Sequence, residues 1–272
     1  MAPSAPDLRL RRLPGSLRRH WLDRPLLAVS ALLIVVSLAF LAAPQLDLAI
    51  SGFFYDPLAG FDGQRVAPLF FVRRMGRLAE WALAVALVAP LIVKFLAPES
   101  RRLLRPRSSF FALATLALGP GLIVNGILKE LWGRARPEDI IDFGGEASFS
   151  PVWWLSDQCD RNCSFVSGEA ASAFWLVSLA FVVPRAWRLP IAIVTLAAAT
   201  AVSFTRLATG GHFISDVLIA WLVTLLVMVA MQKLVLRGLP PQFDSAVETR
   251  IAESGRALRR WWAARHGRPP PG

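Results

Sequence analysis

The segment ISDVLIAWLVTLLVMVAMQKLV, residues 214–235, holds one acidic and one basic residue in an otherwise uncharged stretch. A helix needs roughly 17–25 mostly apolar residues to cross the hydrocarbon core of a bilayer, and this segment has that length. Similar runs occur at residues 26–43, 79–97, 110–128, 170–183 and 189–204, of which the last two are slightly short. We therefore predict an all-α, polytopic membrane protein built as a bundle of six transmembrane helices. The first run is too long for a removable signal peptide and lacks a small-residue cleavage site, so we expect it to be the first helix.

The composition agrees with a membrane protein, because 55% of the 272 residues are apolar. The net charge of +11 comes mainly from basic residues before the first run, between the second and third, between the fourth and fifth, and after the sixth. All four segments fall on one side of the predicted bundle, and an excess of Lys and Arg marks the cytoplasmic side. We therefore expect the bacterial inner membrane, both termini in the cytoplasm, and no nucleic-acid partner.

This organisation divides the chain into three regions. Residues 1–24 are predicted to form a basic cytoplasmic tail, residues 25–236 the membrane domain, and residues 237–272 a second basic cytoplasmic tail. Within the last region, residues 252–268 (AESGRALRRWWAARHGR) are typical of a basic, Trp-bearing helix on the inner leaflet. A solvated tail is the alternative.

Arginines also occur on the outer side, where the charge rule does not expect them. Four of them follow the first helix: Arg65, Arg73, Arg74 and Arg77. Their long side chains either extend to the membrane interface or form a basic rim for an anionic lipid headgroup. Arg73 and Arg74, with Arg134 in the next outer segment, are the candidate headgroup contacts.

Cys159 and Cys163 lie in the long outer loop between the third and fourth helices. In an oxidising periplasm they either close a small disulfide loop, for which the chain must fold back, or remain free thiols. His20 and His266 lie in the terminal tails, so we expect no zinc site at the cysteines.

Three polar clusters lie at the outer ends of the helices. KELWGRARP (129–137) follows the third helix, SFVSGE (164–169) opens the fourth, and TRLATGGHFISD (205–216) joins the fifth to the sixth. The clusters are far apart in sequence, yet the predicted topology brings them to one membrane face. We therefore expect an active site there, facing the periplasm.

The cationic residues of the clusters suit a phosphate group. Lys129, Arg136 and Arg206 supply three positive charges, and guanidinium groups bind phosphate oxygens in pairs. Ser167 and Gly168 stand at the start of a helix, where free N–H groups favour an anion.

His212 is the only histidine outside the tails, and Asp216 follows one helical turn later. The carboxylate would hold the ring in one tautomer and raise the basicity of the other nitrogen. A phosphate held by the cations and attacked by the imidazole would give a phosphohistidine, which water then hydrolyses.

These clusters resemble the signature of the type-2 phosphatidic acid phosphatase superfamily, which contains lipid phosphate phosphatases and vanadium haloperoxidases. The first part of that signature, a lysine followed after six residues by Arg-Pro, is complete from Lys129 to Pro137. In the third part Thr205 replaces serine, and the Arg, His and Asp stand at the family spacing. The resemblance extends from the third to the sixth helix.

The second part departs from the family pattern, because Val166 replaces proline and Glu169 replaces histidine beside the retained Ser-Gly. The resemblance implies phosphate binding by five residues: Lys129, Arg136, Arg206, Ser167 and Gly168. It further implies that His212 is the nucleophile and Asp216 its partner.

The resemblance gives the residue at position 169 the role of the acid that protonates the leaving oxygen. A carboxyl group does this near neutral pH only if burial or a nearby negative charge keeps it protonated. We therefore predict that Glu169 donates a proton when substrate is bound. Alternatively, the leaving group needs no acid, or Glu169 contacts the substrate, or the site has no catalytic activity.

The segment NCSFVSGE is similar to bacterial lipid A phosphatases of this superfamily. We predict a phosphoric monoester hydrolase acting on lipid A or a related glycolipid without metal or cofactor. Undecaprenyl diphosphate, phosphatidylglycerol phosphate and phosphatidic acid are alternative substrates. A lipid phosphotransferase and a non-catalytic lipid-binding protein are alternative functions, and the oligomeric state stays open.

Overall fold

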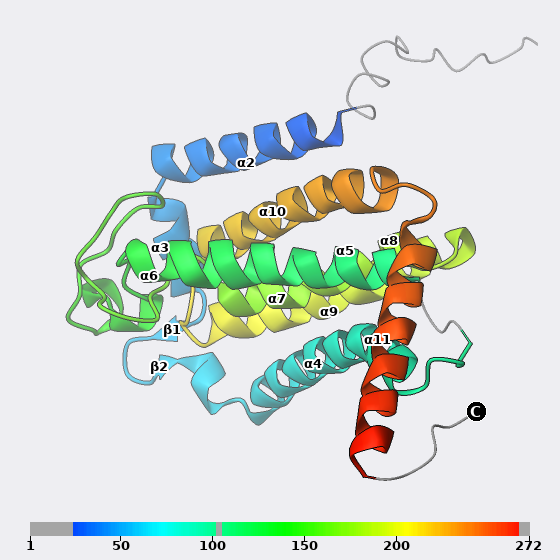
Figure 1. Ribbon diagram of the computed structural model, residues 1–272. Helices are drawn as coiled ribbons and strands as arrows, with labels where there is room; N and C mark the ends of the chain where they lie inside the picture. Colours follow the sequence, from blue (N-terminus) through cyan, green and yellow to red (C-terminus); the bar gives the residue numbers. More distant parts are fainter. Residues whose placement is uncertain (1–23, 102–104, 267–272) are drawn as a thin grey trace, which may run out of the picture.

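The long helices of this protein lie side by side as a bundle (Figure 1). The computed structural model describes residues 24–101 and 105–266. The predicted N-terminal tail, apart from Arg24, lies outside the described residues, as do Arg102 and residues 267–272.

Five helical stretches in the described residues are long and apolar enough to cross a membrane. They are α2 (Pro25–Ala42), α4 (Ala67–Leu96), Pro106–Leu131, Arg185–Ala208 and Ile214–Arg237. A sixth apolar helical stretch, Gly168–Val182, is shorter. The predicted all-α fold is therefore confirmed, whereas the count of six membrane crossings stays a prediction.

The shorter stretch lies in the centre of the bundle. It consists of α7 (Gly168–Trp175), the 3-10 turn η5 (Leu176–Ser178) and α8 (Leu179–Val182). Helix α7 packs against α9 (Arg188–Ala208) and α10 (Ile214–Met231). Trp175 is fully buried, and its indole Nε1 donates a hydrogen bond of 2.7 Å to the carbonyl of Ala112. Because neighbouring helices surround it, α7 can hold the polar residues of its first turn away from lipid.

The third membrane stretch contains a π-helical segment. Helix α5 (Pro106–Leu116) continues into η2 (Ala117–Leu128), with π-helical hydrogen bonding, and ends in α6 (Lys129–Leu131). Pro120 lies inside η2 and has no backbone N–H to donate, which removes one bond of the α-helical ladder. The Asn125 side chain donates to the Pro120 carbonyl at 2.7 Å. The altered winding carries Lys129 to the end of the bundle.

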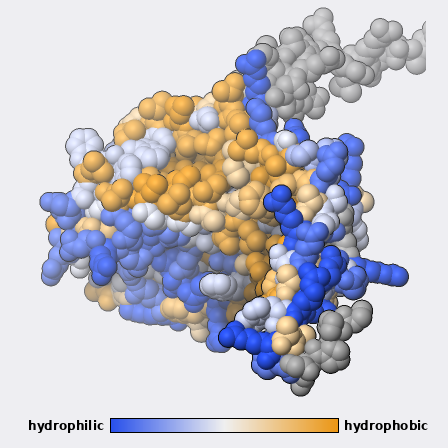
Figure 2. Space-filling model, viewed as in Figure 1, coloured by the Kyte–Doolittle hydropathy of each residue, from blue (hydrophilic) through white to orange (hydrophobic). Residues whose placement is uncertain are grey.

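The outward surface of the helices is largely apolar. Helix α2 buries only Ser37 and Phe40, and it packs mainly on α10. Large apolar side chains on the other helices also face outward, among them Trp81 and Val194. Figure 2 shows an apolar surface over α2, α5 and α10, with hydrophilic surface toward both ends of the helices. This arrangement fits a bundle surrounded by lipid.

One end of the bundle carries most of the irregular structure, and all three polar clusters meet there (Figure 1). After α3 (Gln45–Gly52), strands β1 (Tyr55–Asp56) and β2 (Gly60–Phe61) pair in antiparallel fashion, and η1 (Asp62–Arg65) follows. The long loop after α6 contains the 3-10 turns η3 (Pro137–Asp139) and η4 (Ile141–Phe143).

Helix α4 begins earlier than the sequence predicts, at Ala67 instead of residue 79. Arg73, Arg74 and Arg77 therefore lie within the helix and not in a loop before it. The sequence-based boundary was wrong because hydropathy treats charges as helix ends, although arginine is a good helix former. Gly76 brings α4 close to α9, since a Cβ there would lie 2.4 Å from Val202 Cγ2.

The opposite end of the bundle carries η6 (Arg185–Trp187), the π-helical η7 (Gln232–Arg237) and α11 (Phe243–Arg265). Helix α11 occupies most of the predicted C-terminal tail and packs against α4 and α5. A Cβ on Gly255 would lie 2.0 Å from the Phe95 carbonyl oxygen, so the two helices touch closely. For residues 252–268 the sequence left open a basic helix or a solvated tail, and the structure shows a helix as far as Arg265.

Candidate active site

The three polar clusters come together at the irregular end of the bundle. Lys129 lies in the last turn of the third membrane stretch, and Arg136 follows in the loop. Glu169 lies in the first turn of α7, Arg206 in the last turn of α9, and His212 just before α10. The convergence expected from the topology is therefore present.

His212 is held in one tautomer by a backbone carbonyl. Its Nδ1 lies 2.7 Å from the carbonyl oxygen of Ser164, and the side chain is only 2% exposed. A carbonyl oxygen can only accept, so Nδ1 carries the proton of the neutral ring. Nε2 then has a free lone pair, as a nucleophile requires.

Asp216 does not hold this ring directly, contrary to the sequence-based expectation. Its Oδ2 lies 3.9 Å from His212 Nδ1, which is beyond hydrogen-bond distance. Oδ2 instead accepts hydrogen bonds from Ser164 Oγ at 2.6 Å and from the Phe213 N–H at 2.9 Å. Because Ser164 is also the partner of His212, Asp216 acts on the ring by fixing Ser164.

Arg134 lies inside the protein and cannot contact a headgroup, so its expected role is corrected. Its side chain is 1% exposed and lies between two carboxylates. Nη1 donates to Asp216 Oδ1 at 2.6 Å, and Nη2 donates to Asp47 Oδ2 at 2.8 Å. The guanidinium carbon also lies 4.3 Å from the centre of the Phe213 ring. Burial alone would lower the pKa of Arg134, but the two acids together outweigh this effect and raise it. Pairing with them therefore explains how this cation is buried.

The sequence did not single out Asp47, which comes from α3. Its carboxylate also accepts bonds from the backbone and hydroxyl of Ser215, at 3.1 and 2.6 Å. The available signal was a single acid in the apolar stretch QLDLAIS. A lone acid in such a stretch marks a polar contact, but only the folded chain identifies its partner.

The predicted phosphate-binding cations surround His212. Burial and then the charges of Arg206, Lys129 and Arg136 lower the pKa of His212 well below its ordinary value. Within the described residues, the buried Nε of Arg206 has no hydrogen-bond partner. Arg136 is partly committed, because its Nη2 donates to the Asn162 carbonyl at 2.8 Å. The ring therefore lies in a positive field that suits an anion.

Ser167 and Gly168 form the start of α7, as predicted. Ser167 Oγ caps the helix by accepting from the Ala170 N–H at 3.4 Å, and its own N–H donates to the Asp216 carbonyl. The Gly168 N–H is the first of the helix and has no partner within it. A Cβ on Gly168 would lie 2.2 Å from Asn125 Oδ1, so only glycine fits against that side chain.

Glu169 forms a two-point contact with Arg73 of α4. Arg73 Nε donates to Oε2 at 2.5 Å, and Nη2 donates to Oε1. This pairing favours the ionised carboxylate in the free protein, which is the opposite of a preformed acid. Arg73 is thus a part of the site and not an outer headgroup contact, whereas its neighbour Arg74 is exposed.

The outer loop places its remaining residues around the site. Cys159 and Cys163 form a disulfide, one of the two predicted alternatives. Trp153 packs against Trp132 and Phe165, while Trp154 is exposed. No group of three or more His, Cys, Asp or Glu side chains within the described residues could hold a metal ion.

The buried charge cluster predicts a large stability effect for Arg134→Leu. The substitution would leave the carboxylates of Asp47 and Asp216 buried without their cation, which costs about 3–5 kcal/mol. The free energy of unfolding in detergent measures this loss, with the exposed Arg161→Leu as the charge-matched control. Equal stability of the two variants would contradict this account of the cluster.

The environment of His212 predicts an acid-shifted titration. Because its folded-state pKa is lowered, the ring should stay neutral as the pH falls through about 6.5 and should protonate only at more acidic pH. NMR of protein with carbon-labelled histidine measures this midpoint, and the signal lost in His212→Ala assigns it. A midpoint at or above 6.5 would show that the surrounding cations do not act on the ring.

Comparison with known proteins identifies relatives of this chain. The PAP2 superfamily matches residues 109–238. A lipid A 4'-phosphatase of Francisella tularensis subsp. novicida is 34% identical over 184 residues, which cover 65% of this chain and 81% of that protein. A lipid A 4'-phosphatase of Rhizobium leguminosarum is 46% identical over 120 residues, 44% of this chain. The matched region spans 52% of that Rhizobium protein, about half its length.

A solved structure supports the fold. The crystal structure of a transmembrane PAP2-type phosphatidylglycerolphosphate phosphatase from Bacillus subtilis superposes with a TM-score of 0.52 at 19% identity. The match covers 77% of this chain and 95% of that one. With its apolar helices, this chain is a membrane protein. The sequence matches and the shared fold together show that the chain belongs to the PAP2 superfamily.

Proposed function

We propose that this protein is a membrane lipid phosphatase that removes a phosphate from lipid A or a related glycolipid through a phosphohistidine. One observation carries the proposal: the Nε2 lone pair of a buried His212 lies in the field of Lys129, Arg136 and Arg206. A phosphate bound by these cations would meet a nucleophile that is already in the correct tautomer. The names of the relatives in Francisella and Rhizobium support lipid A as the substrate.

An apolar groove beside the site supports a lipid substrate. It lies between α4 and α9 and has a volume of about 650 Å³. It is lined by Leu69, Val72, Ile193, Leu196, Ala197, Thr200, Ala201, Phe204 and Thr205. Val72 and Thr205 directly precede Arg73 and Arg206 in the chain. An acyl chain in this groove would therefore bring its phosphate toward the arginines.

The reaction would proceed in two balanced steps. In the first step, His212 Nε2 attacks phosphorus, the bond from phosphorus to the lipid oxygen breaks, and that oxygen takes a proton from Glu169. In the second step, water attacks the phosphohistidine, the bond from phosphorus to nitrogen breaks, and Glu169 takes a proton from the water. Inorganic phosphate and a lipid alcohol leave, and both side chains return to their starting states.

Glu169 can play this role only if substrate changes its pairing with Arg73. A phosphate dianion competes with the carboxylate for the guanidinium, since both anions fit its two-point geometry. Once displaced, the half-buried carboxylate lies beside a negative phosphate, and both conditions favour its protonated form. The substrate would thereby create the acid that its own leaving group requires.

We further propose that the site faces the periplasm of the inner membrane, with both termini in the cytoplasm. Exposed arginines at the opposite end, such as Arg185 and Arg188, support this orientation. The disulfide between Cys159 and Cys163 lies at the site end, and disulfides persist in oxidising compartments.

The central experiment measures phosphate release by purified protein from a panel of lipids. The panel contains lipid A, phosphatidylglycerol phosphate, phosphatidic acid and undecaprenyl diphosphate. We expect the fastest release from lipid A, and roughly a thousandfold or greater loss of kcat in His212→Ala. His266→Ala, at the other end of the bundle, is the matched control.

Two outcomes would overturn this function. Release that survives in His212→Ala would remove the phosphohistidine. Binding of these lipids without release by the wild-type protein would make it a lipid-binding protein.

A second experiment tests Glu169 as the proton donor. Glu169→Gln should lower kcat on lipid A by about a hundredfold or more, because general acids contribute 10²–10⁴ in rate. In a single turnover, which reports the first step alone, the loss should be much smaller on p-nitrophenyl phosphate, whose phenolate leaves without a proton. Glu169→His should recover part of the lipid activity. Arg73→Gln should raise KM, with Arg185→Gln, exposed at the opposite end of the bundle, as the control. Equal single-turnover losses in Glu169→Gln on both substrates would exclude the role of proton donor.

A further inference from the structure

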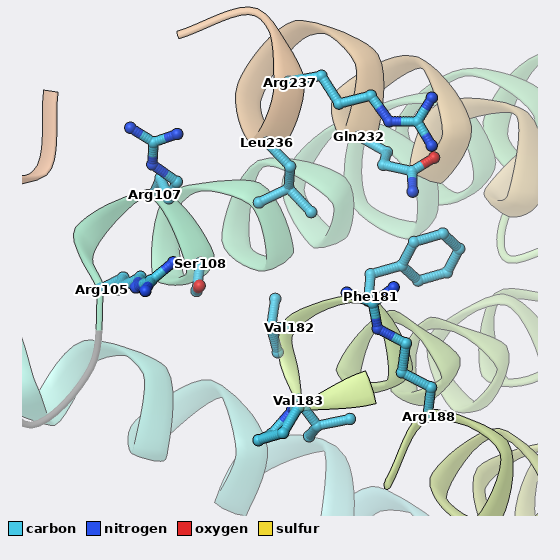
Figure 3. A pocket seen from close by; sticks show the side chains of 11 residues that line it. Arg105, Arg107, Ser108, Phe181, Val182, Val183, Arg188, Gln232, Leu236 and Arg237 are labelled. Atoms are coloured by element: carbon cyan, nitrogen blue, oxygen red, sulfur yellow. The ribbon is translucent and has the colours of Figure 1, made fainter. Parts of the chain in front are cut away.

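A second charged pocket lies at the end of the bundle opposite the candidate active site (Figure 3). Its volume is about 760 Å³, within the range of ligand pockets. Four arginines contribute to its lining: Arg105, Arg107, Arg188 and Arg237. The remaining residues are Ser108, Phe181, Val182, Val183, Pro184, Gln232 and Leu236. We refer to it as the basic pocket.

The basic pocket is separate from the catalytic end. Helix α9 begins at Arg188 in the pocket and reaches Arg206 of the candidate active site 18 residues later. At 1.5 Å per residue, this separation is about 27 Å, close to the thickness of the hydrocarbon core of a bilayer. A ligand in the basic pocket therefore lies at the opposite membrane boundary from the phosphate cradle.

The positive charge of the pocket is mostly unmatched. Arg107 Nε donates to Asp244 Oδ2 at 2.9 Å, and its Nη2 donates to the Pro240 carbonyl, so this arginine has an acidic partner. Within residues 24–101 and 105–266, the side chains of Arg105, Arg188 and Arg237 have no such partner. Three uncompensated guanidinium groups around one cavity favour an anionic ligand.

The walls of the pocket are arranged for an amphipathic ligand. Figure 3 shows Arg237 and Gln232 close together on one helix, and Arg188 extending toward Phe181. Phe181, Val182 and Leu236 are only partly buried, and they give the cavity an apolar side. The arginines and the amide form the polar side. A soluble anion would use only the polar side, whereas a phospholipid would use both.

We propose that the basic pocket binds an anionic phospholipid from the leaflet at that end of the bundle, with the headgroup phosphate on Arg188 and Arg237 and the upper acyl region against Phe181 and Leu236. Basic pockets between membrane helices suit anionic headgroups, because charge attraction and apolar burial act together. A neighbouring cavity of about 540 Å³ shares Arg105, Arg107 and Arg237, which leaves room for a larger headgroup.

Bound lipid would connect segments that are distant in the sequence. The pocket joins the start of α5, the end of α8, the start of α9 and η7. A ligand that binds this assembled form and not the unfolded chain raises stability by mass action. The lipid would thus act as a clamp on the helix ends remote from catalysis.

The test uses the full-length protein, freed of lipid in neutral detergent. Phosphatidylglycerol, phosphatidylcholine or inorganic phosphate is added, bound lipid is counted by native mass spectrometry, and Tm is measured. We expect phosphatidylglycerol to bind and to raise Tm, and phosphatidylcholine to have little effect. Any rise in Tm with inorganic phosphate, which can bind at the candidate active site, should persist in the double variant Arg188→Gln with Arg237→Gln. This variant should weaken the Kd of phosphatidylglycerol about tenfold or more, because contacts to charged groups are lost. Arg185→Gln is the control, since Arg185 is exposed at the same end but does not line the pocket.

Three results would overturn the proposal. Phosphatidylglycerol could bind the double variant as well as the wild type. Arg185→Gln could weaken binding equally, which would indicate diffuse attraction. Inorganic phosphate could raise Tm as much as the lipid does and lose this effect in Arg188→Gln with Arg237→Gln, which would assign the pocket to a soluble anion.

If the variant with both Arg188→Gln and Arg237→Gln does not fold, Arg188→Lys with Arg237→Lys replaces it in the test. The lysines keep the charge but cannot bind a phosphate at two points. Unchanged phosphatidylglycerol binding by this lysine variant would also contradict a specific site. Phosphatidylglycerol is a phosphodiester, so the result does not depend on the phosphatase proposed above.

Discussion

The geometry of the site depends on Arg134, a buried cation held between Asp47 and Asp216. A charge in this position is tolerated only because two carboxylates and the Phe213 ring surround it. Its contacts join the outer loop to α3 and α10, so three separate parts of the chain are fixed at one point. Asp216 in turn holds Ser164 by accepting a hydrogen bond from its hydroxyl, and the carbonyl of Ser164 fixes the His212 ring. The orientation of the proposed nucleophile is thus the last step in a chain of buried hydrogen bonds.

The buried cluster around Arg134 and the surroundings of His212 differ in how their charges are paired. Around Arg134 each charged group has a hydrogen-bonded partner of opposite sign, which gives rigidity without reactivity. Around His212 the cations exceed the acids, and Arg206 keeps a buried N–H without a partner in the described part of the chain. Such an unsatisfied donor is costly in an empty site and becomes favourable when a phosphate oxygen accepts from it. The excess charge is therefore placed where an anionic ligand would remove the cost.

Much of this arrangement could be predicted from the sequence, because alternation of apolar runs and polar clusters fixes which residues share a membrane face. The approach of Lys129, Arg206 and His212 needed only the number of crossings and the helix ends. The roles of Arg134 and Arg73 could not be obtained in this way, because an arginine near a membrane boundary has the same local sequence whether it is exposed or buried. Whether such an arginine is buried depends on its acidic partners. The partner Asp47 lies 87 residues from Arg134 in the chain, so local sequence does not reveal it. Hydropathy also placed the start of α4 too late, since it does not register that Glu169 can pair with Arg73 in the helix.

The pairing of Arg73 with Glu169 gives a physical reason for the departure from the family pattern at position 169. A histidine there would face the guanidinium of Arg73, and protonation of its ring would place two cations side by side. A glutamate reverses the interaction, because its carboxylate attracts Arg73 and balances one of the positive charges near His212 in the absence of substrate. A substrate phosphate offers Arg73 a second anion of the same geometry and leaves the carboxylate next to a negative group. In the proposed reaction the two residues therefore act as one unit, in which Arg73 keeps the carboxylate of Glu169 ionised until a substrate phosphate displaces that carboxylate.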